Sequence, residues 1–280
     1  VGMQFEIEHT VTDDDSSVSF KIEFQDAAGN TNEVTTASDG SSVTIDKAAP
    51  TLSGVTIASD NTNNSLAKLG SIVTLSFTAS EAIQSPTVTI LGNNINASNT
   101  SDNNWTATHT VVANDTDGPV NFTIDYVDLA GNAGTQVTTV TDSSSVTVDK
   151  AAPTLGLVTI ASNNANTSLA TVGNTVTLTI EDDQYSTITK VTLLDEVFNN
   201  PQGTIKQIEG VPVGMQYEIQ HTVTADDAAG IVTFKIEFQD AAGNTSEVTA
   251  VTSGSGVTIT GNQSPTSISC LLYTSDAADD

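Results

Sequence analysis

Acidic side chains and asparagines recur in two kinds of segment, and their oxygen atoms are suited to binding a cation. A D-x-A-G-N sequence occurs at Asp26–Asn30, Asp128–Asn132 and Asp240–Asn244. Ca²⁺ takes six to eight oxygen ligands in flexible geometry, including carboxylates and amides. A second acidic group follows each H-T-V sequence and comprises Asp13, Asp14 and Asp15, then Asn114, Asp115 and Asp117, then Asp226 and Asp227.

A third acidic source lies where one stretch of repeated sequence passes into the next. The string D-K-A-A-P-T-L occurs at Asp46–Leu52 and again at Asp149–Leu155. V-G-M-Q-F-E-I-E-H-T-V-T at 1–12 returns with two changes at 213–224, and F-K-I-E-F-Q-D-A-A-G-N-T at 20–31 returns at 234–245. Similarity of this length indicates a tandem array. We therefore predict a partial repeat at 1–45, complete repeats at 46–148 and 149–260, and the start of a further repeat or a linker at 261–269.

The elements that must position these residues are β-strands. Apolar residues alternate with polar ones along Val18–Phe24, and the same alternation recurs at 120–126 and 232–238. No segment has the 3.6-residue period of a helix, and threonine, which favours strands, is abundant. About seven short strands in roughly 100 residues predict an all-β fold of tandem Ig-like antiparallel β-sandwich repeats.

The partial first repeat has a structural consequence. Residues 1–45 supply only the last three strands of a sandwich, so the opposite sheet is missing. We therefore expect the inward side chains of this segment to be unusually exposed, namely Phe5, Phe20, Ile22 and Phe24.

The strand that ends in D-x-A-G-N, the Val/Thr-rich strand after it and the V-D-x-x-A-P-T junction resemble the bacterial Ig-like tandem repeats of large cell-surface adhesins and biofilm-associated proteins. The resemblance covers residues 1 to about 266. It implies a stalk on the bacterial surface or in the extracellular space, with the adhesion target bound by regions outside this sequence. The last eleven residues, 270–280, fit no repeat and resemble the translation of a sequencing adapter, so we predict a non-native tail there.

Composition excludes several classes of function. The 280 residues carry a formal net charge of −27, and all seven basic residues are lysines. Nucleic-acid binding needs a cationic surface, and attachment to anionic lipid needs basic clusters, so neither is expected. No apolar run is long enough to cross a membrane. The single cysteine, Cys270, lies in the tail, which leaves no disulfide or thiolate chemistry for the repeats.

In an Ig-like sandwich the loop after H-T-V lies at the end where the chain leaves, and the D-x-A-G-N turn lies at the opposite end. The three acidic sources should therefore converge where repeats meet, with neighbouring repeats as partners in cis. This placement predicts Ca²⁺ between repeats, stiffening the stalk. The alternative is that D-x-A-G-N forms only a turn, with Gly29 at positive φ and Asp26 bonded to turn amides. The predicted ligands are Asp13, Asp14, Asp15, Asp46, Asp128 and Asn132 at the first junction and Asp115, Asp117, Asp149, Asp240 and Asn244 at the second, with Glu81, Asp182 and Asp183 nearby.

Catalysis is not expected. His9, His109 and His221 occupy the same position in successive repeats, where a packed and hydrogen-bonded role is favoured, and no nucleophile, zinc or phosphate-binding motif is present. The leading interpretation is a structural stalk of an adhesin. One alternative is a spacer or carbohydrate-binding accessory region of a large secreted polysaccharide-degrading enzyme, which would need exposed aromatics, whereas Trp105 is expected to point inward. Another is that the repeats are themselves adhesive, for which the loop at Asp195–Pro201 is the first candidate.

Overall fold

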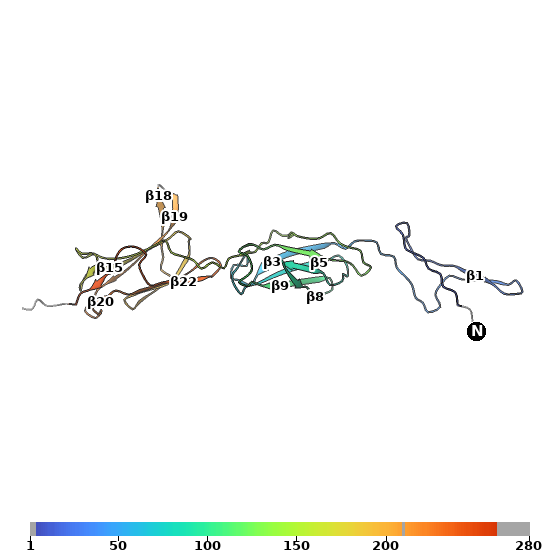
Figure 1. The fold of residues 1–280 in the computed structure, drawn as a ribbon, viewed down its shortest axis with the longest axis horizontal. Helices are drawn as coiled ribbons and strands as arrows, with labels where there is room; N and C mark the ends of the chain where they lie inside the picture. Colours follow the sequence, from blue (N-terminus) through green and yellow to red (C-terminus); the bar gives the residue numbers. More distant parts are fainter. Residues whose placement is uncertain (1–3, 209–210, 262–280) are drawn as a thin grey trace, which may run out of the picture. The chain divides into compact units, whose positions relative to one another are not determined.

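The computed structural model describes residues 4–208 and 211–261, and in this part of the chain every regular element is a β-strand (Figure 1). The chain divides into two compact units that alternate along the sequence. One comprises Val1–Ala58, Thr74–His109 and Val120–Ser145, and the other comprises Ser59–Val73, Thr110–Pro119 and Val146–Asp280. The repeat boundaries deduced from the sequence remain predictions. The tail at 270–280 and Cys270 lie outside the described residues.

Three sheets belong mainly to the first unit. The smallest is a hairpin of two strands, and the others have four and three strands. In their hydrogen-bonded order, the strands are β1 (Ile22–Gln25) and β2 (Thr31–Val34); β3 (Leu52–Ser59), β5 (Ile72–Ala79), β9 (Asn104–Thr110) and β8 (Ser98–Ser101); and β11 (Phe122–Asp125), β6 (Thr87–Ile90) and β7 (Asn93–Asn96).

Four sheets belong to the second unit. Their strands, in hydrogen-bonded order, are β10 (Gly118–Pro119), β12 (Thr147–Val148) and β4 (Leu66–Ala67); β13 (Leu157–Ser162), β15 (Thr175–Asp182), β19 (Val211–Thr222) and β18 (Thr204–Ile208); β14 (Leu169–Ala170), β23 (Thr258–Ile259) and β20 (Gly230–Ile231); and β17 (Glu196–Asn199), β16 (Thr187–Leu193), β21 (Phe234–Gln239) and β22 (Thr245–Val248). Short parallel pairs join β4 to β12 and β14 to β23, whereas the ladders of β15 with β13 and β19 and of β16 with β21 are antiparallel. The all-β, antiparallel prediction is confirmed.

Side-chain alternation explains where the core forms. Along β15, Val176, Leu178 and Ile180 are fully buried while the threonines between them are partly exposed. On the facing sheet, Val191 of β16 and Ile236 of β21 are fully buried in the same core cluster. Successive residues of a strand point to opposite faces, so one apolar face per sheet is removed from water. Each fully buried side chain of this kind contributes about 1.5–3 kcal/mol.

The segment expected to be a loop at Asp195–Pro201 is in part a strand, so that prediction is wrong. Glu196–Asn199 forms β17 and pairs with β16, as β7 pairs with β6. Leu194 and Asp195 have φ values of 49° and 64°, which a tight hairpin turn requires. The predicted repeat at 149–260 is longer than the one at 46–148. Its additional residues therefore lie after β17, in the region where β18 and β19 form (Figure 1).

The predicted exposure of the N-terminal segment is confirmed. Phe5 is 82% exposed, and Phe20, Ile22 and Phe24 are 43%, 49% and 50% exposed. The accompanying expectation of three strands was only partly correct, because β1 and β2 form whereas residues 4–12 and 43–45 form no strand. Their counterparts at 213–224 and 147–148 pair with β15 and with β4 and β10. A strand needs a hydrogen-bonding neighbour, and the described residues offer these two segments none.

Two matched substitutions test this difference in environment. Phe238 is 2% exposed and Phe24, at the equivalent position of an almost identical segment, is 50% exposed. We expect Phe238→Ala to reduce the free energy of unfolding by about 3–5 kcal/mol, and Phe24→Ala to reduce it by less than about 1 kcal/mol. Hydrogen exchange measured as a function of urea concentration, at the β21 amides for Phe238→Ala and at the β1 amides for Phe24→Ala, gives the two losses. Equal losses from the two variants would contradict the burial described above.

Candidate metal centre

Three carboxylates from separate segments of the first unit meet at one place. Oxygen atoms of Asp46, Glu81 and Asp128 all lie within 4.8 Å of one another. Asp46 precedes β3, Glu81 follows β5, and Asp128 follows β11. An isolated bridge between Ile83 and Asp128 brings the second and third segments together. Among residues 4–208 and 211–261, this is the group of carboxylate and imidazole side chains close enough to share a metal ion.

The turn around Asp128 orients this carboxylate. Its Oδ1 accepts hydrogen bonds from the backbone amides of Gly131 (2.6 Å) and Asn132 (2.8 Å), and its Oδ2 accepts one from Asn132 Nδ2 (2.7 Å). Gly131 has a φ of 100°, a conformation that glycine adopts without steric cost. Burial alone would raise the pKa of Asp128, but the hydrogen bonds from Asn132 and Gly131 outweigh it and hold the pKa below its usual range. The turn therefore presents an ionised carboxylate.

The remaining contacts tie the linker to the same turn. Asn132 Nδ2 also donates to the backbone carbonyl of Asp46 (3.1 Å), and Asp46 Oδ1 accepts from the amide of Ala48 (3.0 Å). Three like charges this close repel one another unless a cation lies among them. Their oxygens match the preference of Ca²⁺ for hard ligands, and the exposure of Asp46 leaves room for water to complete a shell.

The acidic loop after the first H-T-V sequence does not enter this group. Its backbone accepts the ammonium of Lys47 instead, with Nζ donating to the carbonyls of Asp13 (2.7 Å) and Asp15. The carboxylate of Asp15 closes its own loop by accepting from the amide of Thr12 (2.8 Å). Hydrogen bonds from Thr12 and from His9 to this carboxylate hold the pKa of Asp15 below its usual range. The exposed turn residue Asp14 likewise contributes no ligand to the group.

The second D-K-A-A-P-T-L string places Lys150 at the position that Lys47 has in the first string. Lys150 Nζ donates to the carbonyls of Ala113 (2.9 Å) and Asp115 and lies 3.7 Å from the carboxylate of Asp117. The Asp115 carboxylate accepts from the amide of Val112 (2.8 Å). Asp115 and Asp117 thus hold an ammonium group where a metal ion had been predicted.

The second junction repeats the turn but not the carboxylate triad. Asn244 Nδ2 donates to Asp240 Oδ2 (2.9 Å) and to the carbonyl of Asp149 (3.0 Å), as Asn132 does at the first junction. Gln184 stands where the sequence repeat places Glu81, and its Oε1 accepts from the amide of Thr154 (3.2 Å). No metal-capable group is present there among the described residues. Asp182 is buried, and its Oδ1 accepts from the amide of Gln184 (3.0 Å).

Sequence reasoning missed the two lysines because it considered only oxygen ligands and calcium. The signal was available, since both copies of D-K-A-A-P-T-L place a lysine directly after the aspartate. With seven lysines in a chain of charge −27, a cation repeated at a fixed position indicates a specific contact. An ammonium group and a metal ion satisfy the same need for positive charge beside oxygen atoms.

The three histidines differ in environment although they share a repeat position. The side chain of His9 is 70% exposed, whereas His109 is buried and that of His221 is 13% exposed. His221 Nδ1 lies 2.8 Å from Glu196 Oε2, and Nε2 lies 3.0 Å from Asp227 Oδ2. Glu196 belongs to β17 and His221 to β19, so the imidazole joins two sheets of the second unit. The packed and hydrogen-bonded role predicted for the histidines is confirmed at His109 and His221, whereas His9 is hydrogen-bonded to Asp15 but is not packed.

This cluster predicts a pH-dependent stability. Burial lowers the pKa of His221, but hydrogen bonds and charge attraction from Glu196 and Asp227 outweigh it and raise the pKa above its ordinary value. A raised folded-state pKa means that the stabilisation is fully present below about pH 6.5, the unfolded value, and is lost as the pH rises through the folded value. We expect Glu196→Gln to flatten this dependence of the unfolding free energy between pH 5 and 8.

Urea unfolding across that pH range, with Glu33→Gln as a control glutamate on β2, provides the measurement. A pH dependence that is identical in the Glu196→Gln variant and the unaltered chain would show that the ion pair has no role in stability.

Three large aromatic side chains of the two complete repeats point inward. Trp105 is 7% exposed, as predicted, and Tyr126 and Tyr217 are each 6% exposed, so these rings lie in cores. Comparisons with known proteins add no identity, since no family model and no curated protein matches this chain. In the part of the chain that the structure describes, no helix has the length and hydrophobicity needed to span a membrane.

Proposed function

We propose that this chain is a stalk or spacer segment of a bacterial surface or secreted adhesin, a non-catalytic element that holds a binding region away from the cell. The observation that carries the proposal is the repetition of the junction contacts. At each D-K-A-A-P-T-L string, the lysine donates to loop carbonyls, and the asparagine of D-x-A-G-N donates to the carbonyl of the linker aspartate. The same contacts at successive junctions would give the repeats a defined spacing, whereas catalysis needs only one active site.

The second junction has two further contacts of the same type. Asn61 Nδ2 donates to the carbonyl of Ala242 (2.8 Å), and Lys68 Nζ donates to the carbonyl of Gly243 (2.7 Å). Both bonds end on the backbone of the D-x-A-G-N turn, so the turn is held by side chains distant in sequence. Each neutral hydrogen bond contributes about 0.5–1.5 kcal/mol, and one from an ammonium group contributes more. Several together restrict bending at the linker, which a stalk requires.

Calcium supplements these bonds at the first junction in our proposal, and Asp46, Glu81 and Asp128 would hold it. The remaining predicted ligands serve the junctions through hydrogen bonds and the lysine contacts. Extracellular calcium sites of this kind have dissociation constants of about 10⁻⁴–10⁻³ M. Such a site is filled outside a cell, where calcium is abundant, in keeping with the proposed location.

Calorimetric titration with CaCl₂ tests the metal site by both loss and gain of function. We expect weak binding that Glu81→Gln removes, because one of three carboxylates becomes neutral. Gln184→Glu should create a second site at the other junction by completing the set with Asp149 and Asp240. Asp39→Asn, in an exposed turn, is the control. Equal binding by the unaltered chain and Glu81→Gln would contradict this site.

The lysine contacts give a separate test of the stalk. We expect Lys150→Met to broaden the distribution of distances between spin labels placed at residues 92 and 195, measured by double electron–electron resonance in a Cys270→Ser background. Methionine keeps much of the apolar stem but cannot donate to the carbonyls of Ala113 and Asp115. Lys190→Met, which alters a partly exposed lysine of β16, is the control. A distribution that Lys150→Met leaves unchanged would remove the main support for a defined spacing.

A further inference from the structure

The second unit contains a small cavity formed by the start of β16, the loop after β17 and part of β19. Its volume is about 170 Å³, which is the space of five or six water molecules at about 30 Å³ each. Hydroxyl and amide side chains line it at Ser186, Thr187, Asn200 and Gln202, and the buried ring of Tyr217 belongs to its apolar lining. The cavity therefore combines a few polar groups with an apolar surface, as small-ligand sites do.

A buried carboxylate lies directly behind this lining. Asp182, the last residue of β15, is 1% exposed, and its Oδ1 accepts a hydrogen bond from Ser186 Oγ at 3.5 Å. Met215, which also lines the cavity, is its partner in the ladder of β15 with β19. Burial, together with the charge of Asp182, raises the pKa of Tyr217. Among the described residues, no group donates a hydrogen bond to Asp182 Oδ2, and a buried acceptor left in this state is costly.

The preceding repeat shows that the fold does not need these polar groups. Ala79 ends β5 as Asp182 ends β15, and Ile83 stands where the sequence repeat places Ser186. Ala79 and Ile83 are buried, with exposures of 3% and 7%, so apolar side chains pack well at both positions. An acid and a hydroxyl at these positions weaken a core unless they have another role.

The loop that closes the cavity is also particular to this repeat. One residue, Ala97, separates β7 from β8, whereas the four residues 200–203 separate β17 from β18. A Cβ atom at Gly203 would lie 2.7 Å from Cε1 of Tyr217, so the backbone of the loop packs against the phenol ring and glycine is required there. This packing brings the two amide side chains of the loop to the same cavity as Ser186.

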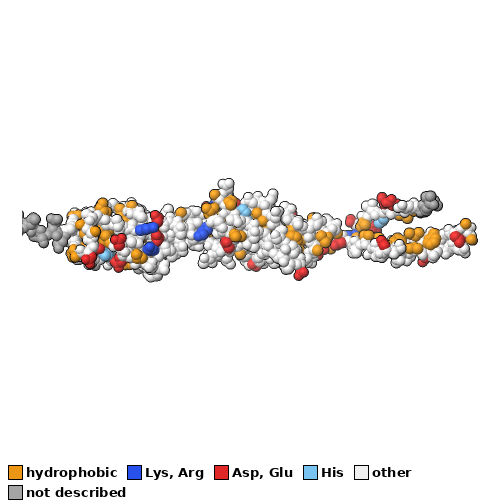
Figure 2. Space-filling view, turned by 90° about the horizontal axis from the view of Figure 1, so that it is seen from below, with side chains coloured by type: hydrophobic (Ala, Val, Ile, Leu, Met, Phe, Trp, Pro, Cys, Tyr) orange, Lys and Arg blue, Asp and Glu red, His pale blue; other side chains and the backbone are white. Residues whose placement is uncertain are grey.

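Charge and hydrogen-bonding capacity select a neutral ligand rich in hydroxyl groups. No charged side chain lines the cavity, and the net charge of −27 disfavours an anion. Figure 2 shows that backbone and uncharged polar side chains make up most of the displayed surface, with few lysines. Hydroxyl and primary amide groups both donate and accept hydrogen bonds, as the hydroxyls of a sugar do. The free oxygen of Asp182 accepts only, and a sugar hydroxyl can supply its missing donor.

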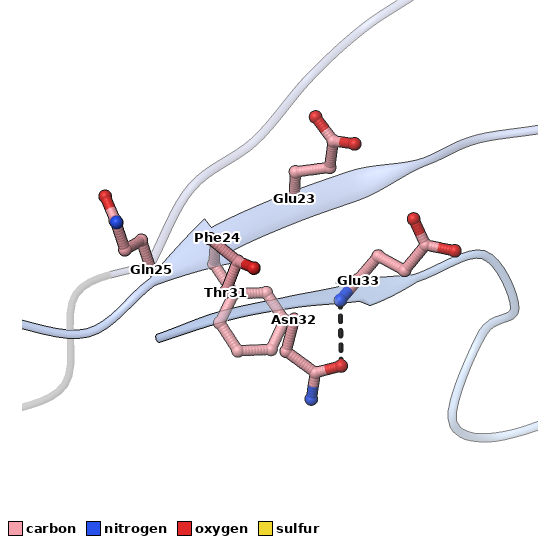
Figure 3. Close-up of a pocket in the computed structure, with 6 residues that line it drawn as sticks. All are labelled: Glu23, Phe24, Gln25, Thr31, Asn32 and Glu33. Carbon is pink, nitrogen blue, oxygen red and sulfur yellow. Dashed lines mark hydrogen bonds between the residues drawn. The ribbon is translucent and has the colours of Figure 1, made fainter. Parts of the chain in front are cut away.

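The larger cavity beside β1 and β2 has a different character (Figure 3). It measures about 510 Å³, and all six residues that line it are exposed. Figure 3 shows Glu23 and Glu33 on one side of the strands and the ring of Phe24 on the other. Lys21 lies 2.6 Å from Glu23 and 2.9 Å from Glu33, so these carboxylates already have a cation. No buried polar group lines this cavity, in contrast to the one at Ser186.

We propose that the cavity of the second unit binds one neutral hexose residue. One sugar hydroxyl donates to Asp182 Oδ2, directly or through a single water molecule. A second hydroxyl donates to Ser186 Oγ, whose own proton is directed at Asp182. The amides of Asn200 and Gln202 bind further hydroxyls, and the apolar lining contacts the ring carbons. The site gives the repeat at 149–260 a ligand of its own, in addition to the proposed stalk function and independently of calcium.

Titration of the ¹⁵N-labelled full chain with simple glycosides tests this site by nuclear magnetic resonance. The probes are the methyl α-pyranosides of D-glucose, D-mannose and D-galactose at millimolar concentrations. We expect saturable shifts of the amide resonances of residues 186–188 and 200–203 with at least one of them. The amides of residues 83–85, the corresponding stretch of the preceding repeat, should not shift, because that repeat has neither the polar pair nor the longer loop.

Variants of the buried pair define the mechanism of binding. Ser186→Ile, which introduces the residue found at position 83, should abolish binding because it fills the cavity. Asp182→Asn should weaken binding at least tenfold, because the charged acceptor is lost, whereas its Oδ1 can still accept from the amide of Gln184. Asp183→Asn makes the same change at the exposed neighbouring residue and should leave the affinity unaltered. Unchanged resonances of β13 and β23 show that the variants remain folded.

Three outcomes would overturn the proposal. The first is the absence of saturable shifts at residues 186–188 and 200–203 with all three glycosides. The second is equal affinity of a glycoside for the unaltered chain and for the Asp182→Asn variant. The third is a response of these amides to 1,4-diaminobutane and to none of the glycosides, which would identify a site for an ammonium group.

Discussion

The two four-stranded sheets of the second unit each bury one face, and each depends on the other to cover it. The two nearly identical segments 20–31 and 234–245 demonstrate the constraint within a single chain. Where the sheet of β21 packs against that of β15, Phe238 and Ile236 are buried, and where the described residues provide no facing sheet Phe24 and Ile22 remain exposed. Both segments nevertheless form the hairpin, and β1 pairs with β2 in the same register as β21 with β22. Local hydrogen bonding thus forms the hairpin, and the apolar face determines whether it becomes part of a core.

The junctions solve a problem that the composition creates. A chain with net charge −27 brings its carboxylates together wherever acidic loops meet a linker, and like charges must be separated or balanced. Two devices are visible. Asparagine and backbone amides stabilise the ionised aspartates of the D-x-A-G-N turns by hydrogen bonding, and a lysine from each linker donates hydrogen bonds to carbonyls of the acidic loop. Among the described residues, the group of Asp46, Glu81 and Asp128 brings three carboxylates within 4.8 Å of one another.

Strand positions and inward residues were predictable because a period of two is a local property. Val176, Leu178 and Ile180 could be assigned to one face from the sequence, and all three are fully buried. The turn role of D-x-A-G-N was also predictable, since glycine at positive φ and aspartate bonded to nearby amides are local features. The acidic group was predicted only in outline. Asp46 and Asp128 come together with Glu81 as expected, but the loop at Asp13–Asp15 binds Lys47, and this contact depends on where the linker places a flexible side chain.

The sequence by itself determined the strand class, the alternating faces and the repetition of the joints, because these depend on residue type and spacing over a few positions. The tertiary structure alone decided three matters that involve residues distant in sequence. It joined Glu196 to His221 across two sheets, it gave lysines the positions expected for metal ions, and it left the edge of β1 without a partner strand among the described residues. Each outcome depends on which groups the fold brings next to a given oxygen atom or strand edge, and spacing along the chain does not specify that.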